Sequence, residues 1–132
     1  MQLKKNTITI DANVILRYLL KDNKDMYEIC EKFFNEVFNS KTNAYILQAV
    51  LAEVIYVLLK LYKVSKKELI DVLEDLLASK NIKVQDKETT LEALSIFKKN
   101  NLDFVDCLIC AYGKNVEIFS FDKKVNNLIG KL

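Results

Sequence analysis

Histidine is absent from this chain of 132 residues, and its absence removes several kinds of active site. Without an imidazole there is no histidine general base, no Ser-His-Asp triad and no histidine-paired cysteine nucleophile. The same absence disfavours a zinc site and an iron site held by two histidines and a carboxylate. Chemistry carried by carboxylates is not affected.

Proline is also absent, and the only two glycines are Gly113 and Gly130, so Gly-rich phosphate loops and flexible linkers are excluded. No apolar run approaches the roughly 18–20 residues that cross a bilayer, because Gln48 and Glu53 interrupt the longest one, 44–59. The N-terminal residues lack the apolar segment of a signal peptide. We therefore expect one domain over residues 1–132, in the cytoplasm and without a membrane partner.

The three cysteines are an odd number, which argues against a secreted disulfide framework. Cys107 and Cys110 form a C-x-x-C pair, but no second pair or histidine completes a zinc site. On a helix these two positions share a face, which favours two small buried hydrophobic side chains. Redox or metal chemistry is the alternative.

The net charge is only +2, and all of the 20 basic residues except Arg17 are lysines. This composition gives weak support for a nucleic-acid partner, contacted through point charges and not through bidentate guanidinium groups. A solvated lysine-rich surface explains it equally well.

Short apolar runs alternate with helical patterns along the whole chain. We expect strands at 7–10, 44–47, 81–84 and 116–119, and helices at 12–20, 26–38, 48–62, 65–78, 89–99, 103–112 and 122–128. The first strand should be buried, and the helix at 48–62 should be central because it is apolar on most faces. This order predicts the α/β class, with a mainly parallel sheet covered on both faces as a three-layer sandwich.

Four acidic residues interrupt the most apolar stretches of the chain: Asp11, Glu53, Asp106 and Asp122. Acidic side chains are almost never fully buried unless they are paired, and a lone buried carboxylate costs several kcal/mol. Asp11 and Asp122 also follow predicted strands, at the edge of a parallel sheet where ligands bind. We therefore look for a shared cause of the four placements.

Each acid also has a structural explanation to set against a functional one. Asp11 could cap the helix that follows it, and Asp122 could cap the last helix with Ser120 assisting the turn. Asp103 could cap the helix that contains Asp106. Glu53 is hardest to explain in this way, because no lysine or arginine lies three or four residues from it.

A divalent cation bound by all four acids is the simplest common cause. Neighbouring carboxylates repel one another and raise one another's pKa, and a cation removes that penalty. Mg²⁺ and Mn²⁺ are hard cations that prefer oxygen ligands and that activate water for hydrolysis. The pattern therefore predicts metal-assisted hydrolysis of a phosphodiester, with Asp106 or Glu53 orienting or deprotonating the attacking water.

Four segments, in order, resemble the acidic motifs of PIN-domain nucleases. They are Ile10-Asp11-Ala12-Asn13-Val14, Ala52-Glu53-Val54-Ile55-Tyr56, Asp103-Phe104-Val105-Asp106-Cys107 and Phe119-Ser120-Phe121-Asp122-Lys123. The likeness spans nearly the whole chain. In size and single-domain form the chain is most similar to VapC-type toxins of toxin–antitoxin pairs.

That resemblance implies an α/β/α fold, Mg²⁺- or Mn²⁺-dependent endoribonuclease activity, a homodimer and inhibition by a small antitoxin. It gives metal-site roles to Asp11, Glu53, Asp106 and Asp122. Ser120 and Asn13 stand where the family often has supporting polar residues, and Asp103 is expected to be a cap or a supporting group. Family members often carry arginines near the groove, whereas this chain has only Arg17 and would depend on lysines.

Other functions remain possible on the same residues. A PIN nuclease in RNA or DNA processing would use the same acids, and a non-catalytic PIN-like module that binds RNA or protein would not need them together. A haloacid-dehalogenase-like phosphatase would have Asp-x-Asp after the first strand, where this chain has Asp11-Ala12-Asn13. Tyr56 and Tyr62 are expected in the core or in a dimer interface.

Overall fold

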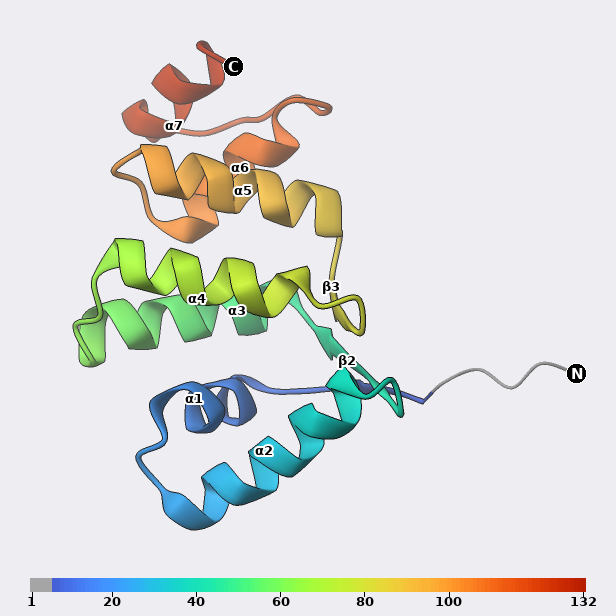
Figure 1. The fold of residues 1–132 in the computed structure, drawn as a ribbon. Coiled ribbons are helices and arrows are strands. Elements are labelled where there is room, and N and C mark those ends of the chain that lie inside the picture. The colour runs from blue at the N-terminus through green and yellow to red at the C-terminus, as the bar shows by residue number, and fades with distance from the viewer. Residues whose placement is uncertain (1–5) are drawn as a thin grey trace, which may run out of the picture. The chain divides into compact units, whose positions relative to one another are not determined.

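The computed structural model describes residues 6–132, and the chain forms two compact units (Figure 1). The first unit ends at Gln85, and the second runs from Asp86 to Leu132. Residues 1–5, where the sequence predicts no signal peptide, lie outside the described part. No helix in residues 6–132 is long and apolar enough to cross a membrane.

A parallel three-stranded sheet organises the first unit, in the order β1-β2-β3. The strands are β1 (Thr7–Thr9), β2 (Asn43–Ile46) and β3 (Ile82–Val84). Ala44 of the central strand pairs with Ile8 on one side and with Ile82 on the other. The predicted α/β class with a parallel sheet is therefore confirmed.

Helices connect these strands, as parallel pairing requires. They are α1 (Ala12–Leu20), α2 (Lys24–Phe38), α3 (Gln48–Tyr56) and α4 (Lys66–Ala78), with a π-helical segment, η1 (Val57–Leu61), directly after α3. Helix α1 packs against both α2 and α3, and α4 contacts β3. The predicted start of α4 is confirmed, because the Ser65 hydroxyl accepts a hydrogen bond from the Glu68 backbone N–H at 3.2 Å.

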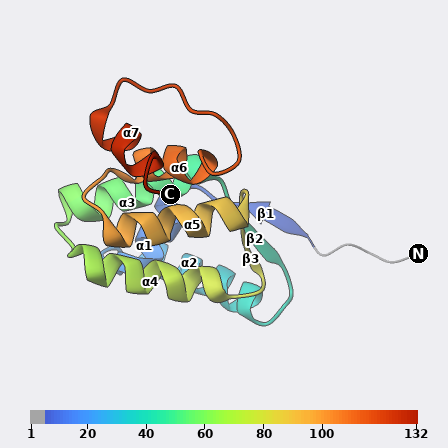
Figure 2. The ribbon, with the colours of Figure 1, turned by 90° about the horizontal axis from the view of Figure 1, so that it is seen from above.

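The second unit consists of three helices: α5 (Lys87–Lys99), α6 (Phe104–Tyr112) and α7 (Lys123–Ile129). Helix α6 packs against both α5 and α7 (Figure 2). Phe97 and Phe104 meet edge to face, with ring centroids 5.9 Å apart, and Val125 buries α7 in the same core. Gly113 ends α6 where Ile118 returns, and an added Cβ there would lie 3.1 Å from the Ile118 side chain.

Two expectations about strands are wrong. Residues 116–119 form no strand, and Val116 and Phe119 are exposed. The side chains of β1 are exposed, and burial begins only at Ile10, whereas Ile82 and Val84 of the opposite edge strand, β3, are buried. An apolar run becomes a buried strand only when pairing partners and covering layers are present, and neither is encoded locally.

The predicted helix at 48–62 also differs from the structure. It is α-helical only to Tyr56 and then widens into η1, where the Tyr62 N–H bonds to the Val57 carbonyl. It was expected to be central, but one side of it faces solvent, where Ala49, Glu53, Tyr56 and Lys60 form an exposed stripe. Leu51, Val54 and Ile55 are its buried face.

Candidate functional site

Asp11 is the N-cap of α1, directly after the buried Ile10 that follows β1. Its backbone is extended, and its Oδ1 accepts a hydrogen bond from the Val14 N–H at 3.1 Å. The side chain is exposed. The capping explanation is thus observed, and it occupies one carboxylate oxygen.

Glu53 is the second candidate ligand of the first unit. It lies on the exposed stripe of α3, the helix that packs against α1, which Asp11 caps. An exposed carboxylate needs no buried partner. The apolar neighbours that made Glu53 conspicuous in the sequence belong to the other face of the helix.

Asp106 lies in the first turn of α6 and is half-buried. Burial raises the pKa of its carboxyl, and the negative charges of Asp122 and Asp103 raise it further. Unlike a buried ion pair, this arrangement places like charges near one another. It is the signature that a site built to receive a cation would have.

Asp122 starts α7 and is exposed. Its Oδ1 accepts hydrogen bonds from the N–H groups of Lys124 at 2.8 Å and Val125 at 3.1 Å. The Ser120 hydroxyl accepts from the Asp122 N–H at 3.0 Å, which confirms its predicted part in the turn. No strand precedes Asp122, so its expected place at the end of one is wrong.

The remaining supporting residues have plainer surroundings. Asn13 is exposed in the first turn of α1. Asp103 occupies the N-cap position of α6, but its side chain makes no capping hydrogen bond. Its carboxylate instead acts on Asp106 through its charge.

The four candidate ligands are divided between the units, with Asp11 and Glu53 in the first and Asp106 and Asp122 in the second. Neither unit, over residues 6–132, gathers three acidic or cysteine side chains closely enough to hold a metal ion by itself. The expectation that the acids are buried is wrong, since only Asp106 is even partly so. Asp11 and Asp122 are exposed because they begin helices, and Glu53 is exposed because it lies on the outward face of α3. Their neighbours in the sequence are apolar all the same.

Cys107 and Cys110 are both fully buried and unpaired by disulfides, as the simpler explanation predicts. Burial raises the pKa of the Cys110 thiol, and Asp106 and Asp122 raise it further. The thiolate, which is the reactive and metal-binding form, is therefore disfavoured.

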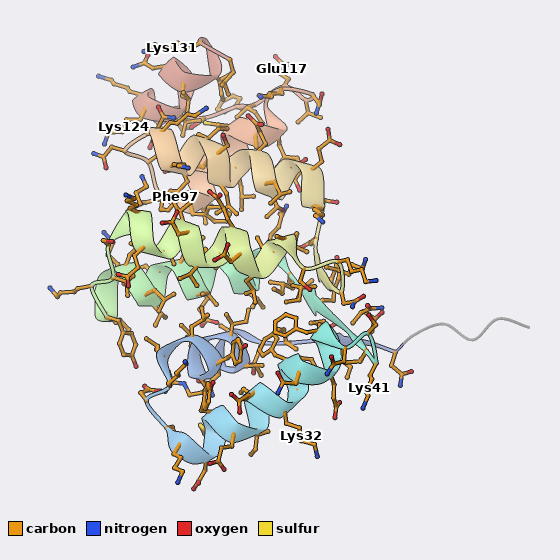
Figure 3. The ribbon with its side chains drawn as sticks, viewed as in Figure 1. Lys32, Lys41, Phe97, Glu117, Lys124 and Lys131 are labelled. Carbon is orange, nitrogen blue, oxygen red and sulfur yellow. The ribbon has the colours of Figure 1, made fainter. Side chains whose placement is uncertain are left out.

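Lysines of both units are exposed to solvent. Lys32, Lys41, Lys124 and Lys131 extend outward from the ribbon (Figure 3) and are exposed. Among the described residues, lysine side chains such as these are available for phosphate contacts.

One cluster was missed in the sequence. Arg17 pairs with Asp22 at 2.8 Å, and Tyr62 donates a hydrogen bond to the same carboxylate at 3.3 Å. The sequence signal was the lone arginine in a lysine-rich chain.

The fold is α/β with a parallel sheet, and an acid, Asp11, follows closely after its first strand. The PIN domain family matches residues 8–130, and the chain belongs to that family. A VapC ribonuclease of Aquifex aeolicus (strain VF5) is 26% identical over 122 residues, which cover 90% of this chain and 90% of that protein. No solved structure matches the chain.

Proposed function

We propose that this protein is an endoribonuclease that depends on Mg²⁺ or Mn²⁺ and acts as the toxin of a type II toxin–antitoxin pair. The observation that carries the proposal is the membership of nearly the whole chain in the PIN family, beside a relative named as a VapC ribonuclease. That relative matches over 90% of both chains, so the likeness is not limited to one motif.

Asp11, Glu53, Asp106 and Asp122 are the proposed cation ligands. The donor set suits a hard cation, because it offers only carboxylate oxygens and the chain has no histidine. Asp11 and Asp122 each accept their capping hydrogen bonds with Oδ1, so Oδ2 of each side chain remains for a cation. The raised pKa of Asp106 marks a place where positive charge would be stabilising.

The cation would supply Lewis acidity toward a phosphoryl oxygen and a water of lowered pKa. Asp106 or Glu53 orients the attacking water and accepts its proton. Ser120 holds the turn that presents Asp122, and Asp103 adds negative charge beside Asp106. Asn13, exposed and two residues after Asp11, is a proposed supporting polar group.

The proposed partners are an RNA substrate, a small antitoxin and a second copy of the chain. The exposed lysines support RNA binding by phosphate contact. A neighbouring short reading frame for an antitoxin, and growth arrest relieved by its product, would separate a toxin from a processing nuclease.

The decisive experiment treats RNA with the purified protein in Mg²⁺, in Mn²⁺ and in EDTA, beside Asp11→Asn. We expect cleavage only by the wild type and only with a divalent cation. Equal cleavage in EDTA would contradict the metal requirement. Cleavage by Asp11→Asn at the wild-type rate would remove Asp11 from the site and leave it a helix cap.

A further inference from the structure

Arg17, Asp22 and Tyr62 join the ends of two helices in the first unit. Asp22 Oδ2 accepts from Arg17 Nη1 at 2.8 Å and from the Tyr62 hydroxyl at 3.3 Å. Arg17 lies in the last turn of α1, and Tyr62 ends η1. One carboxylate oxygen therefore connects the C-terminal end of α1 to that of the α3–η1 helix.

The turn after α1 is shaped for this connection. Lys21 adopts a left-handed conformation with φ 54°, and its N–H bonds to the Arg17 carbonyl at 3.2 Å. That turn reverses the chain and brings Asp22 back to the Arg17 side chain. Asn23 then caps α2, so the loop is held on both sides of Asp22.

Arginine is used here although every other basic residue of the chain is lysine. The Arg17 side chain is only 18% exposed, and among the described residues its Nε is buried without a hydrogen-bond partner. Burying that donor opposes folding, so the contact of Nη1 with Asp22 must help to offset it. A flexible ammonium group lacks the fixed geometry of those donors.

The π-helical segment η1 is the second observation that points to this cluster. A π-turn adds a residue to the helical turn, and such insertions occur frequently at functional sites. Here the π-helical segment lies between Glu53 and Tyr62, so an added residue alters the angle between these two positions around the helix axis. Tyr62 is thereby presented to Asp22.

Asp11 and Glu53 lie nearer the N-terminal ends of α1 and of the α3–η1 helix, away from the connected C-terminal ends. Along the axes, roughly 9 Å separates Asp11 from Arg17, and roughly 13 Å separates Glu53 from Tyr62. Helices α1 and α3 are in direct contact. Because helices are stiff, a connection at their C-terminal ends fixes how far one can slide along the other, and so sets the spacing of the two acids.

We propose that Arg17, Asp22 and Tyr62 are positioning residues that hold Asp11 and Glu53 at the spacing required for cation binding. This inference rests on the proposed function. The three residues touch neither cation nor RNA, and they act through the relative placement of α1 and α3.

The test compares Tyr62→Phe with Tyr27→Phe in the full chain, by calorimetric titration with Mn²⁺. Tyr27 is a matched control, because its hydroxyl also donates to a carboxylate, that of Glu31 at 2.8 Å, but within the single helix α2. We expect Tyr62→Phe to bind Mn²⁺ roughly fivefold more weakly, because cation binding must then supply the ordering of the two helices that this hydrogen bond provides in the wild type. Tyr27→Phe should bind as the wild type does.

Arg17→Lys tests whether the geometry of the guanidinium group or only its positive charge is needed. If the fixed direction of the Nη1 donor holds the helices in place, this variant should lose roughly tenfold in Mn²⁺ affinity although its charge is kept. Thermal unfolding without metal records any general loss of stability, and the titrations are done where every variant is fully folded.

The outcomes are distinct. Wild-type affinity in both Tyr62→Phe and Arg17→Lys, with saturable binding to the wild type, overturns this inference alone. Equal weakening in Tyr62→Phe and Tyr27→Phe also overturns it, because the effect would not depend on the connection between helices. Absence of Mn²⁺ binding by the wild type overturns the proposed function together with the inference.

Discussion

Asp106 is the candidate ligand whose surroundings differ most from those of an ordinary surface acid. Burial and the charges of Asp122 and Asp103 all act in one direction, raising its pKa. A carboxyl with a raised folded-state pKa destabilises the protein when it is ionised. The cost is absent below the unfolded pKa of about 3.9 and is complete above the folded value.

Asp106→Asn should therefore raise the melting temperature at pH 7 in EDTA, while abolishing RNA cleavage in Mg²⁺. The gain should shrink as the pH falls and should vanish below about pH 3.9, where the wild-type carboxyl is protonated in both states. Thermal unfolding across pH measures it. Asp75→Asn, an exposed acid of α4, is the control and should change neither property. A lower melting temperature for Asp106→Asn at pH 7 would indicate a structural partner instead.

At the scale of secondary-structure elements, two candidate ligands are also helix caps. Asp11 starts α1 and Asp122 starts α7, each through Oδ1. A cap requires a hydrogen-bond acceptor, whereas a cation ligand also requires the charge. Asparagine keeps the first property and loses the second.

Asp11→Ala should lower the free energy of unfolding by about 1 kcal/mol, whereas Asp11→Asn should leave it within a few tenths of a kcal/mol. Both variants should lose cleavage, because both lose the charge. Urea unfolding and an RNA cleavage assay measure the two effects separately. If activity followed stability, with Asp11→Asn active and Asp11→Ala inactive, the role of Asp11 would be capping alone.

Element boundaries followed the sequence closely where the signals are local. The helix at 12–20 was predicted and found, and the helix predicted at 65–78 is α4, which begins after its Ser65 cap. The strand predicted at 116–119 did not form, because a short apolar run does not by itself supply a pairing partner. The change from α3 to η1 had no signal in composition, since Val57–Leu61 contains ordinary helix-forming residues.

At the scale of the whole molecule, the proposed RNA binding depends on the distribution of charge. The net charge is only +2, so long-range attraction is modest and local lysine contacts must dominate. Each phosphate contact on single-stranded RNA releases counterions and makes the affinity depend on salt.

RNA binding by Asp106→Asn, at constant Mn²⁺, should weaken roughly tenfold between 50 and 200 mM salt, as about two or three phosphate contacts imply. Fluorescence anisotropy with a labelled single-stranded RNA measures the slope. An affinity independent of salt would contradict binding through the lysine surface. That residues 1–132 form a single domain also stays a prediction.

The sequence by itself determined the α/β class, most helix boundaries, the two capping acids and the identity of the candidate ligands. These depend on periodicity, caps and residue chemistry within a few positions of each residue. Only the tertiary structure decided that Glu53 faces solvent, that β1 is an exposed edge and that Arg17, Asp22 and Tyr62 connect two helices. Burial and such connections depend on which distant segments meet, and that is a property of the folded chain.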